Sequence, residues 1–406
     1  MIRPVIVAAA RTAVGKFGGA SAGVPAVDLG ARAIAGALQR AALEGGEIDY
    51  VIMGQVIGAG AGQITARQAA LKAGVPEAVP ALTVNKVCLS GLTAIALADA
   101  LIRTGEVSTV VAGGMESMDQ APYLLPRGRS GLRMGDGAVV DSMIFDGLRD
   151  AFSGQTMGAQ SDKVNRELGI GRREQDEWAA RSHQRAHAAQ QQGRFADEIV
   201  PLEVAPRHGP PIVFESDEGI RGDATFESLA ALSPAFGPEG TITAGNASQL
   251  SNGGAAVIVM SSARATELGL QPLAEVVAHG MSADKPPHLH TVPALALQAA
   301  LNKAGWSTGD LDLVEINEAF AAVALHSARM LLKGSESAIV NVNGGAVALG
   351  HPIGCTGARL AVTLLHELGR RGGGRGGVAL CGGGGQGDAV LFDVAETSSR
   401  AARQGP

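Results

Sequence analysis

The chain has 406 residues, of which 46% are hydrophobic, 18% charged and 3% aromatic, and its formal net charge is −6. This length and apolar content predict two or three domains with large buried cores. The lack of a basic excess argues against a protein that binds nucleic acid or anionic membranes through its net charge. Three cysteines are too few for a disulfide framework, so we expect a reducing compartment, the cytoplasm.

A short buried strand is expected first, within residues 1–12 (MIRPVIVAAART). Its apolar run is too short to cross a membrane, and we expect no signal peptide here and no targeting tripeptide at residues 403–406. After this strand, short apolar strands alternate with helices rich in Ala and Leu. This pattern is typical of an α/β protein with largely buried sheets.

Three pairs of segments resemble each other in the same order along the chain, which indicates a duplicated α/β unit. The pairs are residues 47–54 with 310–317, residues 82–85 with 339–343, and residues 110–114 with 379–383. We expect an N-terminal half at residues 1–119, completed by about residues 249–271, and a C-terminal half at residues 272–406. Equivalent strand ends of the two halves would then meet where α/β sheets bind ligands.

Residues 120–248, between the two halves, are more polar and irregular in composition. They contain a charged helical pattern at residues 172–193 and a proline-rich stretch at residues 201–211. We interpret them as an inserted loop domain that covers the active site, serving as a substrate lid or as an assembly surface.

Cys88, His351 and Cys381 lie in three separate glycine-rich segments that are associated with predicted strand ends. Taken alone, each could be a residue with a purely structural role. Cys88, however, lies between a predicted strand at 82–84 and a predicted helix at 89–102, where the helix N-terminus favours a thiolate and free N–H groups can hold an oxyanion. Together the three residues predict covalent acyl transfer, because carbon–carbon bond formation needs a nucleophile, its base and a group that moves a proton at the α-carbon.

Other segments with potential chemistry are interpreted as structural. Cys355 lies four residues after His351, but no second pair of ligands has zinc spacing, so we expect no metal site and a packing role for Cys355. His288 and His290 are expected to be loop histidines. The glycines of residues 58–62 lack the Gly-Lys-Ser/Thr ending of a phosphate-binding loop, which argues against phosphoryl transfer.

The chain closely resembles the thiolase family along nearly its whole length. Four blocks carry the resemblance: residues 85–91 (NKVCLSG), 317–320 (NEAF), 350–352 (GHP) and 381–384 (CGGG). The resemblance implies a duplicated α/β/α/β/α fold with an inserted loop domain. It further implies an acetyl-CoA C-acetyltransferase or 3-ketoacyl-CoA thiolase of fatty acid metabolism and beta-oxidation, which uses acyl-CoA and CoA as substrates and needs no other cofactor. A homotetramer built from two dimers, with residues 122–145 as the tetramer contact, is also implied.

The resemblance also implies a role for each residue of the site. Cys88 would take the acyl group after His351 has deprotonated it, and Cys381 would move the proton on the α-carbon of the second acyl-CoA. Asn317 would hold a water that, with His351, stabilises the thioester enolate. The amides of Cys88 and Gly383 would stabilise the oxyanion of the acyl-enzyme step.

Residues that contact coenzyme A are implied by the same resemblance. Those at the adenine nucleotide end are Arg221 and Ser228, and those along the pantetheine tunnel are Ala244, Ser248, Met157, Ala319 and Phe320. The last three could equally be ordinary core residues.

Three positions depart from the family pattern of short-chain members. Thr156 stands where such members carry a histidine, Leu89 replaces a small residue after the nucleophile, and residues 286–287 are prolines where many members place a methionine. We therefore expect acyl chains longer than acetoacetyl to be accepted.

Two other functions remain as alternatives. A decarboxylating ketoacyl synthase of the same fold usually needs a second histidine, whereas this chain offers Cys381 and the pair Asn317-Glu318. A catalytically silent acyl-CoA-binding protein would be expected to have lost a catalytic residue, and none is missing.

Overall fold

A single mixed sheet runs through the structure and carries strands from both ends of the chain. The protein is represented by a computed structural model that describes residues 2–205, 209–332 and 336–396. The strand order is β12-β13-β14-β11-β1-β10-β5-β3-β4, with the short β2 paired to β10. The strands are β1 (Pro4–Arg11), β2 (Gly15–Lys16), β3 (Tyr50–Gly54), β4 (Ala81–Val84), β5 (Thr109–Ser117), β10 (Ser251–Ser261), β11 (Ala274–Ala283), β12 (Leu313–Ile316), β13 (Gly374–Gly382) and β14 (Gln386–Val394).

Helices connect these strands, and two small hairpins lie outside the sheet. The helices are α1 (Ala26–Ala41), α2 (Thr65–Lys72), α3 (Ser90–Thr104), α4 (Met157–Leu168), α5 (Arg172–Gln191), α6 (Phe226–Ala230), α7 (Ser262–Glu267), α8 (Val292–Ala304), α9 (Ala321–Leu332), α10 (Glu336–Ile339), α11 (Ala346–Leu349) and α12 (Thr356–Arg370), with a π-helix at Met143–Leu148. The hairpins are β6 (Tyr123–Leu124) with β7 (Val140–Asp141), and β8 (Leu202–Val204) with β9 (Ile212–Phe214).

The two ends of the sheet repeat one arrangement. In one half β5, β3 and β4 are parallel neighbours. In the other half β13 and β12 are parallel, and Val340 forms a parallel bridge with β12 in the position that corresponds to β4 beside β3. β10 is antiparallel to β5, as β14 is to β13. The halves meet where β1 pairs with β11, through Val5 with Glu275 and Ile6 with Ala274. The duplicated unit predicted from the sequence is present in the fold.

Side chains alternate between the two faces of each strand, and this alternation builds five layers. In β3, Ile52 packs in the cluster that contains α3 and α12, whereas Val51 and Met53 pack with α1 and α2. In β13, Val378 packs with α3 and α12, whereas Ala379 packs with α8 and α9. α3 and α12 therefore form a middle layer shared by both halves of the sheet. This confirms the α/β/α/β/α order.

The middle layer also accounts for an apolar stretch of the chain. The segment Val87–Thr104 is long and apolar enough to cross a membrane by length and composition, but 61% of it is buried inside the protein. Because α3 is covered by α12 and by the sheet, its composition is that of a core helix.

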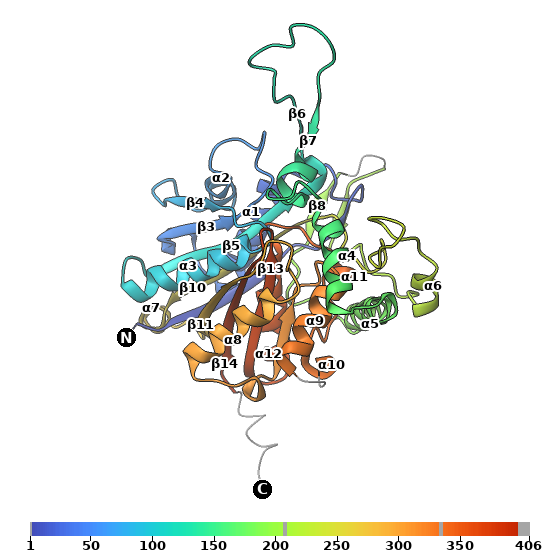
Figure 1. Cartoon of the computed structure of the whole chain (residues 1–406). Coiled ribbons are helices and arrows are strands. Elements are labelled where there is room, and N and C mark those ends of the chain that lie inside the picture. Colours follow the sequence, from blue (N-terminus) through green and yellow to red (C-terminus); the bar gives the residue numbers. More distant parts are fainter. Residues whose placement is uncertain (1, 206–208, 333–335, 397–406) are drawn as a thin grey trace.

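The segment between β5 and β10 lies at one side of the sheet (Figure 1). The predicted charged helix at 172–193 is α5, which packs on α6, α9 and α11. The proline-rich stretch at 201–211 contributes to the hairpin β8–β9, and its residues 206–208 lie outside the described residues. Figure 1 shows the hairpin β6–β7 projecting away from the body with the loop that it carries.

Candidate active site

Cys88 is presented by a strained turn between β4 and α3. Val87, the residue before it, has a φ of +52°, a left-handed conformation that is costly for a β-branched side chain. Three hydrogen bonds fix this turn. The hydroxyl of Ser90 accepts from the N–H of Lys86 (2.8 Å) and donates to the carbonyl of Val87 (2.6 Å), while the Asn85 side chain accepts from the N–H of Val87 (3.0 Å). The turn places Cys88 beside the N-terminus of α3.

His351 lies directly opposite the nucleophile. Its Nε2 is 3.2 Å from the Sγ of Cys88, and its Nδ1 is 2.6 Å from the hydroxyl oxygen of Thr356. The residue is 6% exposed, and burial, followed by the positive charge of Arg359, lowers its pKa to about 3. His351 is therefore neutral in the resting site and can accept a proton.

Cys381 is the penultimate residue of β13 and lines the same cavity as Cys88. Burial raises the pKa of the Cys381 thiol to about 12, and burial followed by the neighbouring Cys381 raises the pKa of Cys88 as well. The N-terminus of a helix favours a thiolate, but at Cys88 the loss of hydration outweighs that field and raises the pKa. The raised pKa values favour the thiol form of both residues.

Asn317 follows β12 and approaches the same ring nitrogen of His351 that contacts Cys88. Its Nδ2 is 3.5 Å from the Nε2 of His351. Its Oδ1 is buried and has no hydrogen-bond partner within the part of the chain that the structure describes. A buried acceptor of this kind is well suited to hold a water molecule.

Glu318, the next residue, anchors this strand end to its surroundings. Its carboxylate accepts hydrogen bonds from the indole N–H of Trp178 (2.9 Å), the hydroxyl of Ser182 (2.7 Å), the side chain of Asn341 (2.9 Å) and the N–H of Val347 (3.1 Å). These donors come from α5, from the segment after α10 and from α11. Glu318 therefore holds the inserted helix against the loop that leads to His351.

A cavity of about 310 Å³ opens over these residues and has a mainly apolar lining. Its lining includes the following predicted site residues: Cys88, His351, Cys381, Gly383, Met157, Ser248, Ala319 and Phe320. Ile144, from the segment 122–145 predicted as the tetramer contact, also lines the cavity. The sequence did not single out the following lining residues: Met118, Leu148, Phe236, Leu250, Leu289 and Ile353. The structure thus brings two thiols and an imidazole together in a pocket suited to an apolar acyl group.

Comparison with known proteins agrees with this arrangement. The family model "Thiolase, N-terminal domain" matches residues 4–263, and "Thiolase, C-terminal domain" matches residues 270–394. The chain belongs to the thiolase family.

Curated relatives cover almost the whole chain. A probable acetyl-CoA acetyltransferase of Mycolicibacterium smegmatis is 55% identical over 388 residues, 96% of this chain and 100% of the relative. A probable acetyl-CoA acetyltransferase of Mycobacterium tuberculosis is 54% identical over 392 residues, 97% of this chain and 99% of the relative. An acetyl-CoA acetyltransferase of Pseudomonas aeruginosa is 52% identical over 388 residues, 96% of this chain and 98% of the relative.

In this thiolase the three remaining predicted CoA contacts lie outside the lining of the cavity. Arg221, Ser228 and Ala244 are exposed. The main-chain N–H of Arg221 donates to the Nδ1 of His183 (3.1 Å), so this buried histidine supports the loop that carries Arg221. Ser228 caps α6, with its hydroxyl accepting from the N–H of Thr225 (3.0 Å).

The positions that depart from the thiolase pattern differ in their surroundings. Thr156 lines the cavity and caps α4, accepting from the N–H of Ala159 (3.4 Å). Leu89 is fully buried in the core, against Gly382, rather than facing the cavity. In the segment with the two prolines, Leu289 is the residue that reaches the cavity.

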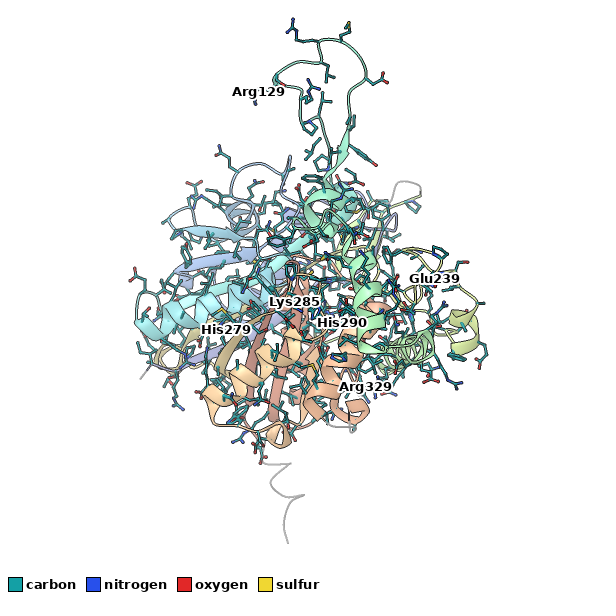
Figure 2. The ribbon with its side chains drawn as sticks, viewed as in Figure 1. Arg129, Glu239, His279, Lys285, His290 and Arg329 are labelled. Atoms are coloured by element: carbon teal, nitrogen blue, oxygen red, sulfur yellow. The ribbon has the colours of Figure 1, made fainter. Side chains whose placement is uncertain are left out.

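The histidines and the third cysteine outside the site have structural surroundings. His290 lies in the turn between β11 and α8, as expected of a loop histidine, and it is fully buried with its Nε2 2.8 Å from the Oδ1 of Asn165 (Figure 2). His288 is one-fifth exposed beside Glu167. Cys355 is 1% exposed and packs in the central core. Among the described residues, no group of three or more His, Cys, Asp and Glu is arranged to hold a metal ion.

Proposed function

We propose that this thiolase is an acetyl-CoA C-acetyltransferase that makes or cleaves 3-ketoacyl-CoA through an acyl-cysteine intermediate. The contact of 3.2 Å between Cys88 Sγ and His351 Nε2, with Cys381 lining the same apolar cavity, carries this proposal. The names of the relatives, acetyl-CoA acetyltransferases at 48% to 55% identity, support it.

In the first half-reaction Cys88 becomes acylated. The proton of Cys88 passes to Nε2 of His351, and the thiolate attacks the carbonyl carbon of acetyl-CoA. The amides of Cys88 and Gly383 are proposed to stabilise the oxyanion that forms. The bond to the CoA sulfur then breaks, and the leaving thiolate takes the proton of Cys381, which leaves an acetyl-Cys88, an imidazolium and a Cys381 thiolate.

In the second half-reaction the carbon–carbon bond forms. The Cys381 thiolate removes a proton from the α-carbon of a second acetyl-CoA, and the enolate oxygen is stabilised by the imidazolium of His351 and by a water held on Asn317. The enolate carbon attacks acetyl-Cys88, and the Cys88 sulfur leaves with the proton from His351. All three side chains are restored to their starting protonation states, and the reverse sequence cleaves 3-ketoacyl-CoA with CoA.

Assembly as a homotetramer of two dimers is part of this proposal. The projecting hairpin and its loop expose large apolar side chains, with Tyr123 71%, Val139 61% and Met134 98% exposed. Figure 2 shows Arg129 on this loop, away from the body of the molecule. Exposed apolar residues of this kind are typical of a surface that another subunit covers.

We also propose a cytoplasmic enzyme of fatty acid metabolism and beta-oxidation that uses no cofactor besides CoA thioesters. All three cysteines are free thiols, which supports a reducing compartment. The thiol and imidazole groups of the site supply the nucleophile, the base and the α-proton carrier, so the proposed cycle needs no further group.

Assays of both directions on the intact protein test the function. We expect condensation of two acetyl-CoA molecules, thiolysis of acetoacetyl-CoA and no requirement for a malonyl donor. Activity only with a malonyl donor that loses CO₂ would favour the ketoacyl synthase. Binding of acetyl-CoA without either reaction would favour the silent acyl-CoA-binding protein.

A further inference from the structure

The first turn of α12 carries a hydroxyl that contacts the ring of His351 on the side away from the nucleophile. Thr356 is fully buried, and its Oγ1 lies 2.6 Å from Nδ1 of His351. The same oxygen lies 2.9 Å from the carbonyl oxygen of Pro352. The chain thus continues from Cys88 Sγ through both ring nitrogens of His351 to Thr356 and ends on the Pro352 carbonyl.

The direction of the hydrogen bonds in this chain follows from its last member. A carbonyl oxygen only accepts, so the hydroxyl of Thr356 donates its single proton to Pro352. Without that proton, two acceptor oxygens would face each other at 2.9 Å. The Thr356 oxygen therefore acts as an acceptor toward His351, and Nδ1 must carry a proton.

The consequence appears at the other ring nitrogen. Burial and Arg359 keep His351 neutral, so a single ring proton is present and its position decides what the residue can do. With that proton on Nδ1, the lone pair of Nε2 points at Cys88, 3.2 Å away. In the other tautomer the proton would be on Nε2. Its N–H would then point at Cys88, and His351 could not accept the proton of the Cys88 thiol.

The Pro352 carbonyl is itself held in place. It accepts from the N–H of Cys355 (2.9 Å) and from the N–H of Thr356 (3.0 Å) as α12 begins. Because two main-chain donors fix this carbonyl, the Thr356 hydroxyl has one defined direction in which to donate. The start of α12 therefore determines which ring nitrogen of His351 carries the proton.

We propose that Thr356 is a positioning residue that holds His351 in the Nδ1-protonated tautomer and thereby keeps Nε2 free to accept the proton of Cys88. The proposal rests on the acyl-cysteine function above. Thr356 does not belong to the lining of the cavity, and it acts by placing a proton on another residue, as supporting groups do for catalytic and metal-binding histidines.

A pair of substitutions at this position tests the proposal. Thr356→Val keeps the shape but removes the hydroxyl, whereas Thr356→Ser keeps the hydroxyl. Single-turnover acetylation of Cys88 by acetyl-CoA, followed by intact-protein mass spectrometry, should slow by about 100-fold in Thr356→Val and stay within about threefold of the unmodified protein in Thr356→Ser. The loss should appear in the maximal rate rather than in the acetyl-CoA concentration that gives half of it.

The outcomes separate this proposal from the function on which it rests. If the unmodified protein is not acetylated, the acyl-cysteine function fails. If it is acetylated and folded Thr356→Val matches it, or Thr356→Ser is as slow as Thr356→Val, the role of Thr356 is overturned.

A measurement on the unmodified protein covers the case in which Thr356→Val does not fold. Ring-¹⁵N-histidine labelling and solid-state NMR, with the His351 signals assigned by their loss in His351→Asn, report which nitrogen bears the proton. A protonated Nδ1 and an unprotonated Nε2 are expected, and a protonated Nε2 would overturn the proposal.

Discussion

The ammonium group of Lys86 lies 2.8 Å from the carboxylate of Asp388, and this ion pair ties the nucleophile turn of one half to β14 of the other. Thr93 of α3 donates to the second carboxylate oxygen (2.8 Å). Although burial alone would raise the pKa of Asp388, the nearby ring of His279 and the ion pair with Lys86 hold it below its ordinary value. The carboxylate is therefore charged, fully buried and dependent on its partners.

Removing the cation of this pair should destabilise the protein and loosen the turn. In Lys86→Met the buried carboxylate of Asp388 loses its ion pair, and because Lys86 is partly exposed we expect a loss of roughly 2 kcal/mol. Arg173→Met, which breaks the exposed pair with Glu177, is the matched control and should cost less than about 1 kcal/mol. Urea denaturation and the rate of Cys88 acetylation measure the two effects. Equal losses of unfolding free energy in Lys86→Met and Arg173→Met would contradict a stabilising role for the buried ion pair of Lys86 with Asp388.

Buried neutral histidines should make the protein sensitive to acid. Burial is the main cause that lowers the pKa of His351 and of His290 to about 3, and that of His183 to about 4. The unfolded chain binds these protons near pH 6.5, so below that pH it holds more protons than the folded state does. The stabilisation is present above about pH 6.5 and is lost as the pH falls toward 3 to 4.

The variant His290→Gln isolates one of these groups. Glutamine can still donate to the Oδ1 of Asn165 but does not titrate. Between pH 7 and pH 5 the variant should lose roughly 1 to 2 kcal/mol less unfolding free energy than the unmodified protein. Urea titrations at both pH values provide the comparison, and parallel losses would show that His290 takes up its proton without unfolding.

Because the pKa of His351 is low, its protonation should not appear in the pH profile of acylation above about pH 5. Since the pKa of His351 is about 3, this base remains neutral throughout the range from pH 5 to 8. The rate constant kcat/KM for acetyl-CoA should therefore show no fall centred near pH 6.5, the ordinary value for histidine. A fall of kcat/KM centred near pH 6.5 would contradict this prediction if it persisted when each of the other histidines was replaced. It would mean that His351 is more hydrated than its surroundings indicate.

The sequence located the three residues proposed to react better than it located the residues that support them. Cys88, His351 and Cys381 follow equivalent elements of a duplicated unit, and chain topology alone brings such strand ends together. The pairing of Lys86 with Asp388 spans 302 residues, and no local pattern marks it. His290 lies in a loop as expected, but its burial depends on packing against α4, which a loop-like local sequence does not reveal.

Thr156 is expected to let the cavity accept longer acyl chains. A threonine side chain is smaller than histidine and, at this position, its hydroxyl caps α4. The protein should cleave 3-ketohexanoyl-CoA as well as acetoacetyl-CoA, and Thr156→His should shift the ratio of their kcat/KM values by about tenfold toward acetoacetyl-CoA. Thr156→Ser retains the cap and serves as the control. If the unmodified protein acts on acetoacetyl-CoA alone, Thr156 does not set the pocket.

The projecting loop should be needed for the tetramer but not for catalysis. Deleting residues 128–137 removes the tip of the loop, including the almost fully exposed Met134, and leaves the cavity lining intact. Light scattering should show tetramers for the full chain and active dimers for the deletion variant. A full chain that is monomeric at micromolar concentration would exclude the proposed assembly.

The two reactive cysteines should differ in the half-reaction that each one serves. Cys88→Ser should lose acyl-enzyme formation, because a serine hydroxyl at hydrogen-bond distance from His351 is a far weaker nucleophile than the thiolate. Cys381→Ser should still be acetylated by acetyl-CoA, because this half-reaction makes no carbon–carbon bond and the imidazolium of His351 can protonate the CoA thiolate when the Cys381 thiol is absent, whereas condensation should fail.

Intact-protein mass spectrometry after mixing with acetyl-CoA distinguishes the two roles. An adduct of about 42 Da, one acetyl group, is expected on Cys381→Ser and is expected to be absent from Cys88→Ser. The reverse pattern would exchange the roles of the two residues. Because both thiols line one cavity, a third result, an adduct on each variant, would mean that either sulfur can be acylated and that His351 serves both.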